Sequence, residues 1–146
     1  MKKDILAPHN IFLGCQSTTR DEAIRLVGER LIEEGYVKDG YLKAMYERED
    51  IVSTYIGNGI AIPHGVGKAK DQILHSGLVV MQYPEGIEYN GNMAYLVIGI
   101  AGKDNDHIKI LANIAEALGE EEDAKKLWKT SDVNLVYKLF TEGDVT

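Results

Sequence analysis

The stretch AYLVIGIA, residues 94–101, decides the fold more directly than any other part of the sequence. It is a continuous apolar run, which is typical of a strand buried on both faces. The loop GKDND follows at residues 102–106, and an apolar pattern of helical period begins near His107. A buried strand that leads directly into a helix predicts an α/β fold, with helices packed around central strands.

Two further strands are predicted nearer the N-terminus. The segment QILHSGLVVMQY, residues 72–83, is rich in β-branched and aliphatic residues, and GIAI at 59–62 is a shorter apolar run. The segment PEGIEYNGN, residues 84–92, is predicted to form turns, because Asn90-Gly91 is a strong turn dipeptide.

Helices are predicted on both sides of these strands. The first follows Thr19, the predicted N-cap, with Glu22 at capping-box spacing, and it stops at Gly35. A second begins after Asp39 and ends near Asp50, and further helices cover 107–118, 120–129 and the segment after residue 131. The residues expected to face inward are Leu42, Met45 and Tyr46, then Ile108, Leu111, Ala115 and Leu118, then Leu127 and Trp128, and finally Val133, Val136 and Phe140. The whole pattern predicts a single-domain α/β (α+β) sandwich over residues 1–146, with a central mixed β-sheet flanked by helices. It does not predict the order of the strands.

The composition excludes several classes of protein. The 146 residues carry a net charge of −7 and no cluster of Lys and Arg, so we expect no nucleic-acid partner. No run approaches the roughly 20 apolar residues of a membrane helix, and the N-terminus lacks the pattern of a signal peptide, so we expect no membrane insertion. Cys15 is the only cysteine, which excludes an intramolecular disulfide and fits a cytoplasmic location.

The segment YIGNGIAIPHG, residues 55–65, places His64 at the tip of a predicted strand. Pro63 restricts its own backbone and that of Ile62, and we expect Gly65 and Gly67 to let the chain turn away from an exposed imidazole. A largely neutral imidazole has a lone pair for nucleophilic attack. The alternative is a histidine that only ends a strand and bonds to a carbonyl group.

His107 and Arg48 are the next candidates. His107 is expected in the first turn of a helix capped by Asn105 or Asp106, just past a buried strand, where α/β proteins often bind ligands. Arg48 could hold a phosphoryl group through two parallel hydrogen bonds. Its acidic neighbours leave a surface ion-pair cluster as the alternative.

The remaining candidates are weaker. His9 has neither a preceding strand nor glycine neighbours, His75 is expected within a strand, and Cys15 has no basic surroundings beyond Arg20. The glycines around His64 fit neither nucleotide-binding loop pattern, because Ile62 stands where each pattern needs glycine. A metal-dependent hydrolase that uses His64 and His107 remains open, although no third ligand is evident, and we expect neither a metal nor a cofactor.

Three blocks together resemble a known family: AMYERE at 44–49, STYIGNGIAIPHG at 53–65 and LVIGIAGKDNDHIKIL at 96–111. The sequence resembles, over essentially its whole length, the enzyme IIA component of the mannitol and fructose type in the bacterial phosphoenolpyruvate-dependent sugar phosphotransferase system. QYPEG at 82–86 and the third block look more like the mannitol branch than the fructose or nitrogen-regulatory branches.

The resemblance implies a function and assigns roles to the three candidates. His64 corresponds to the family's phosphorylated histidine, and His107 and Arg48 correspond to its other active-site residues. A phosphoryl group would come from the histidine-containing phosphocarrier protein and pass to a cysteine of the mannitol transporter's IIB domain. We expect a free-standing IIA with an apolar rim around His64, formed by Ile60, Ile62 and Val66. The alternative is a fructose-type or regulatory protein that signals its phosphorylation state to a partner outside transport.

Overall fold

The computed structural model describes residues 5–65 and 67–141, and within them five strands form one sheet in the order β1-β4-β5-β3-β2. The elements follow each other along the chain as η1 (Pro8–Asn10), β1 (Ile11–Phe12), α1 (Arg20–Glu33), α2 (Tyr41–Ile51), β2 (Tyr55–Gly57), β3 (Ile60–Ala61), η2 (Gly67–Gln72), β4 (Gly77–Tyr89), β5 (Asn92–Ala101), α3 (Asp106–Leu118), α4 (Glu121–Trp128) and α5 (Val133–Thr141). β1 pairs parallel to β4 and β3 parallel to β5, whereas β4–β5 and β2–β3 are antiparallel. The predicted mixed sheet is therefore confirmed.

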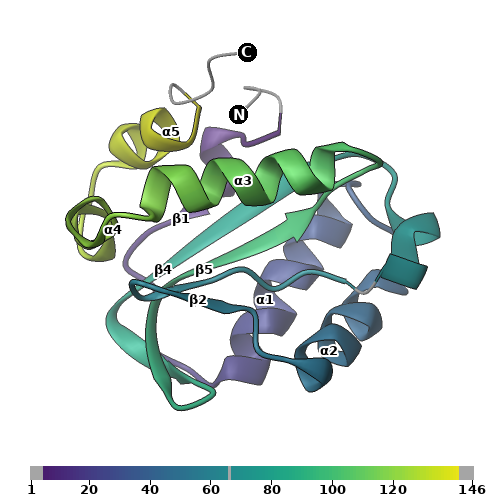
Figure 1. Cartoon of the computed structure of the whole chain (residues 1–146), viewed down its shortest axis with the longest axis horizontal. Coiled ribbons are helices and arrows are strands. Elements are labelled where there is room, and N and C mark those ends of the chain that lie inside the picture. The colour runs from purple at the N-terminus through teal and green to yellow at the C-terminus, as the bar shows by residue number, and fades with distance from the viewer. Residues whose placement is uncertain (1–4, 66, 142–146) are drawn as a thin grey trace.

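Helices cover both faces of the sheet, as the continuous apolar run in β5 predicts. Helices α3, α4 and α5 pack over one face, and α1 and α2 over the other (Figure 1). Each face of the sheet packs against its helices in a separate hydrophobic core. Successive residues of β4 point to opposite sides, so Leu78 and Val80 lie in the core under α3, α4 and α5, while Val79 and Met81 lie in the core under α1 and α2. Each of these four side chains is at most 8% exposed. The molecule is an α/β/α sandwich with two hydrophobic cores.

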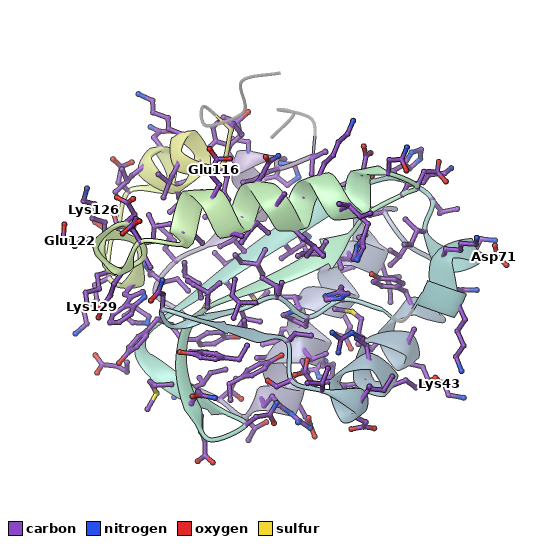
Figure 2. All side chains as sticks on the ribbon, in the orientation of Figure 1. Lys43, Asp71, Glu116, Glu122, Lys126 and Lys129 are labelled. Atoms are coloured by element: carbon purple, nitrogen blue, oxygen red, sulfur yellow. The ribbon has the colours of Figure 1, made fainter. Side chains whose placement is uncertain are left out.

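The surface of this sandwich is charged. Side chains of α2, η2, α3 and α4, and of Lys129 just after α4, project outward from the layers; the labelled ones are Lys43, Asp71, Glu116, Glu122, Lys126 and Lys129 (Figure 2). Within residues 5–65 and 67–141, every helix is too short or too polar to cross a lipid bilayer.

Several predicted helix boundaries are confirmed. The Thr19 hydroxyl accepts a hydrogen bond from the Glu22 amide at the start of α1. Gly35, with φ of 76°, follows the end of the helix. The Glu22 carboxylate bonds to Arg25 instead of closing a capping box. Asn105 occupies the N-cap of α3, but its side chain makes no capping hydrogen bond.

The predicted strand at 72–83 and the turns after it are placed wrongly. Residues 67–72 form η2, His75 lies in a bend, and β4 begins only at Gly77. The same strand then continues through Pro84 to Tyr89, with a register shift between Gln82 and Ile87. Proline is tolerated in a strand at such an irregularity, where a backbone N–H need not pair, so the turn is limited to Asn90 and Gly91.

The predicted inward face of α3 is also wrong in part. Ile110, Ile114 and Leu118 are buried, whereas Ile108 is 71% exposed and Ala115 is exposed as well. Four-residue spacing places the three buried side chains on one stripe of the helix, and that stripe faces the sheet. Ile108 lies off this stripe, beside His107.

Candidate functional site

A pocket of about 400 Å³ lies where β3 and β5 end and α3 begins. β3 and β5 run parallel, and His64 continues the pairing opposite Ile100. His107 is the second residue of α3, five residues after Gly102 leaves β5. Ligand sites in α/β folds are often found at this edge of the sheet, in the crevice outside the carboxyl ends of parallel strands. The residues that line the pocket are Tyr41, Arg48, His64, Gly65, Gly67, Lys70, Ile73, Gly102, Asp104 and His107.

The structure brings all three sequence candidates to this pocket. The ring centroids of His64 and His107 are 5.1 Å apart, with the planes tilted by 57°. Arg48, from the last turn of α2, is the third candidate that lines the pocket, and its Nη1 donates to the Val52 carbonyl oxygen at 2.7 Å. Gly102 permits the close approach of α3, because a Cβ at that position would lie 2.4 Å from Cα of His107.

The alternative for Arg48, a surface ion-pair cluster with its acidic neighbours, does not form. Glu47 pairs with Lys68 at 3.5 Å, and Glu49 turns into the interior, where it is 4% exposed. Among residues 5–65 and 67–141, Arg48 makes no ion pair. Its remaining N–H groups are therefore available to an anion in the pocket.

His64 itself is less exposed than the sequence suggests. It is 7% exposed, and it is one of the residues that line the pocket. Nδ1 lies 2.7 Å from the Ile62 carbonyl oxygen, which can only accept, so Nδ1 carries the proton and donates it. Nε2 then holds the free lone pair. The tautomer, and hence the nucleophilic nitrogen, follows from this single contact.

The electrostatics of the pocket keep both imidazoles neutral near pH 7. Burial lowers the pKa of His64, and the neighbouring His107 and Arg48 lower it further, whereas the Ile62 hydrogen bond and the Glu49 carboxylate raise it by less. The pKa of His107 is lowered by burial and by Arg48. A neutral His64 is the form that can attack an electrophile.

Tyr41 is a part of the site that the sequence did not reveal. Its ring is 2% exposed, and its hydroxyl donates to the Ile100 carbonyl oxygen at 2.7 Å and accepts from the Gly65 N–H at 2.9 Å. Burial raises the pKa of Tyr41 to about 12, so the hydroxyl remains a donor. The expected role of Gly65 changes accordingly: a Cβ there would meet the Tyr41 ring rather than crowd the imidazole.

The other candidates lie elsewhere. His9 contacts Glu34 at the exposed end of α1, His75 lines a different pocket, and Cys15 is half-buried, with a pKa that burial raises. In the described part of the chain, no three His, Cys, Asp or Glu side chains come together as metal ligands, so the hydrolase hypothesis gains no third ligand there.

Comparison with known proteins gives a consistent picture of what the chain resembles. Residues 4–143 match the family model described as "Phosphoenolpyruvate-dependent sugar phosphotransferase system, EIIA 2". The chain is 46% identical over 139 residues to a mannitol-specific phosphotransferase enzyme IIA component of Bacillus subtilis, and the match covers 94% of this chain and 97% of that protein. This chain is also 47% identical over 139 residues to a mannitol-specific EIICBA component of Pasteurella multocida. The match covers 92% of this chain but only 22% of that longer protein.

A solved structure extends the likeness to three dimensions. The structure, a complex of enzyme IIA and phosphorylated enzyme IIB for mannitol from Escherichia coli, matches with a TM-score of 0.88 and 41% identity. The match covers 94% of this chain and 97% of the matched chain. At this level of identity the two share both fold and sequence pattern.

Proposed function

The chain belongs to the EIIA 2 family of the phosphoenolpyruvate-dependent sugar phosphotransferase system, and we propose that His64 is its phosphoryl-carrying residue in mannitol uptake. The observation that carries this proposal is the free Nε2 of a neutral His64, in a pocket shared with Arg48 and His107. The donor is the histidine-containing phosphocarrier protein, and the acceptor is a cysteine of the mannitol transporter's IIB domain. Because phosphoenolpyruvate is a metabolite of the cytoplasm, the proposal also places the protein there.

The transfer is a displacement at phosphorus, in two steps. The Nε2 lone pair of His64 forms an N–P bond as the N–P bond to the donor histidine breaks, and the donor imidazole leaves with the bonding electrons. A cysteine thiolate of IIB then forms an S–P bond, and His64 recovers its lone pair. Nothing is oxidised or reduced, so catalysis rests on positioning and on stabilising the charge of the equatorial oxygens.

Arg48, His107 and His64 each have a part in these steps. The Arg48 guanidinium donates charge-assisted hydrogen bonds to the phosphoryl oxygens. His107 donates from its ring to a further oxygen. The imidazole ring of His64 gains positive charge as Nε2 binds phosphorus, and the Ile62 carbonyl oxygen, already bonded to Nδ1–H, stabilises that charge. Because Nδ1 keeps its proton, the ring departs as a neutral imidazole in the second step, which makes it a good leaving group.

The expected apolar rim needs a correction. Ile60 is fully buried and Ile62 is 8% exposed, so neither can contact a partner, and Val66 lies outside the described residues. The exposed aliphatic side chains beside the site are Ile108, which follows His107, and Ile51 and Val52, which follow Arg48. We assign the docking of both partner proteins to these side chains.

The test is transfer of labelled phosphate from phosphoenolpyruvate in the presence of the two general phosphotransferase proteins. We expect stoichiometric labelling of the wild type and of His9→Ala, and no labelling of His64→Ala. Labelling of His64→Ala would remove His64 from its role. Labelled wild-type protein is then given a mannitol-type and a fructose-type IIB domain, and the mannitol-type domain is expected to accept phosphate faster. Transfer to neither domain would favour the regulatory alternative.

A further inference from the structure

Glu49 is a buried carboxylate directly beside Arg48 in α2, and its hydrogen bonds are saturated. Oε1 accepts from the hydroxyls of Thr54 and Tyr89 at 2.7 and 2.9 Å. Oε2 accepts from the Thr54 backbone N–H at 2.8 Å and from the Asn90 side-chain amide at 3.2 Å. All four of these groups can donate, and the two carboxylate oxygens together take part in four hydrogen bonds. A buried carboxylate with this many partners is costly to disturb.

This network of hydrogen bonds connects α2, which carries Arg48, to the segment that carries His64. Thr54, which Glu49 holds by two hydrogen bonds, accepts through its carbonyl oxygen from the Ile62 N–H at 3.0 Å. Ile62 in turn accepts from Nδ1 of His64 at 2.7 Å. A continuous path of hydrogen bonds therefore runs from Glu49 through Thr54 and Ile62 to the imidazole.

The same short segment is also attached to Arg48. The Arg48 side chain donates to the carbonyl oxygen of Val52, two residues before Thr54. Successive residues of a helix point about 100° apart. Arg48 therefore reaches the pocket while Glu49 reaches the interior. Residues 52–54 are held at one end by Arg48 and at the other by Glu49.

We propose that Glu49 is a positioning residue that keeps the end of α2, and so Arg48, in register with the segment that holds His64. The inference rests on the proposed function, because the register matters only if one phosphoryl group must meet both side chains. Transfer by positioning is sensitive to small displacements, and an error of about 1 Å in the geometry of a site can cost about 100-fold in rate. The length of the Glu49 side chain, rather than its charge alone, is then what transfer requires.

Two substitutions separate length from charge. Glu49→Asp keeps the charge but shortens the side chain by one methylene, so the carboxylate can no longer reach Thr54 without moving α2. Glu49→Gln keeps the length, and the hydroxyls of Thr54 and Tyr89 can rotate to accept from the new amide. We expect Glu49→Asp to slow transfer at saturating donor by about 10- to 100-fold with little change in KM, and Glu49→Gln to slow it less.

Gln82 provides a matched control far from the pocket. Its buried side chain makes three hydrogen bonds, against four for Glu49: it accepts from the Gly14 N–H and donates to the carbonyl oxygens of Leu127 and Thr130. Gln82→Asn likewise shortens a buried polar side chain by one methylene. It is expected to lower thermal stability about as much as Glu49→Asp and to leave the rate of transfer unchanged.

The decisive measurements are single-turnover labelling and NMR of the His64 ring and the Arg48 side chain. Transfer by Glu49→Asp within about twofold of the wild type, or equal slowing in Gln82→Asn, would overturn the proposal. If Glu49→Asp does not fold, Thr54→Val takes its place, since it removes one hydroxyl from the network at constant shape. His64 and Arg48 resonances that do not move in that variant would count against positioning.

The NMR readout also separates this proposal from the proposed function. If the wild type is not labelled, the carrier function fails, yet the resonances still report whether Glu49 holds the two side chains in register. Displaced His64 and Arg48 signals in Glu49→Asp, with unchanged signals in Gln82→Asn, support the positioning role in either case.

Discussion

Gly65 follows His64 directly, and we expect a single methyl group added there to lower the free energy of unfolding. A Cβ added there would lie 2.6 Å from Cε1 of Tyr41, with Cζ and Cδ1 at 3.1 and 3.2 Å. The Tyr41 ring is 2% exposed, and its hydroxyl is bonded to Ile100 and to Gly65 itself, so it cannot easily move away. Gly65→Ala must therefore displace the segment that follows the phosphoryl-carrying candidate.

The cost follows from these contacts. Overpacking by one methyl group costs about 1–3 kcal/mol. Loss of the hydrogen bond between the Gly65 N–H and Tyr41 adds about 0.5–1.5 kcal/mol. We expect the free energy of unfolding to fall by about 2–4 kcal/mol, which corresponds to a loss of about 6–15 °C in Tm for a domain of this size.

Gly67 is the matched control in the same loop. A Cβ at Gly67 meets nothing within 4 Å, so Gly67→Ala should change the free energy of unfolding by no more than about 0.5–1 kcal/mol. Both variants are measured by urea unfolding and by thermal melts, and single-turnover labelling follows the site. If Gly65→Ala proves as stable as Gly67→Ala, the packing of Tyr41 against Gly65 is not the constraint described here.

Three further predictions concern the site. Arg48→Lys keeps the charge but loses the two parallel hydrogen bonds, so transfer should slow by about 10- to 100-fold, and an unchanged single-turnover rate would remove Arg48 from the site. Because the pKa of His64 is lowered from 6.5, labelling should rise with pH through a midpoint below pH 6.5, whereas a midpoint at or above 6.5 would contradict the neutral nucleophile. In that window the unfolded chain binds a proton that the folded chain does not, so stability should also fall as the pH drops from 6.5 toward the lowered pKa. Ile108→Glu should raise the KM for both partners and leave stability within about 0.5 kcal/mol, whereas Leu135→Glu, on α5, should leave KM unchanged; equal effects on KM would refute docking beside His107.

Local patterns predicted much of the scaffold. The apolar run at 94–101 forms the central strand β5, and the start of α1 at Thr19 and its end before Gly35 follow capping rules that involve only neighbouring residues. The strand placed at 72–83 was wrong because its end depends on pairing with β5 and on a register shift, neither of which is encoded locally.

The sequence by itself determined which chemical groups are present and how the chain approaches them: a histidine behind a proline, a second histidine at a helix start, and an arginine near the end of a helix. Only the tertiary structure decided that His64 is buried, that Nε2 is its free nitrogen, that Ile108 is exposed and that Glu49 turns inward to Thr54 and Tyr89. The physical reason is that turns and caps depend on interactions between neighbouring residues. Burial and these hydrogen bonds depend on contacts that the packing of α2, the sheet and α3 brings together.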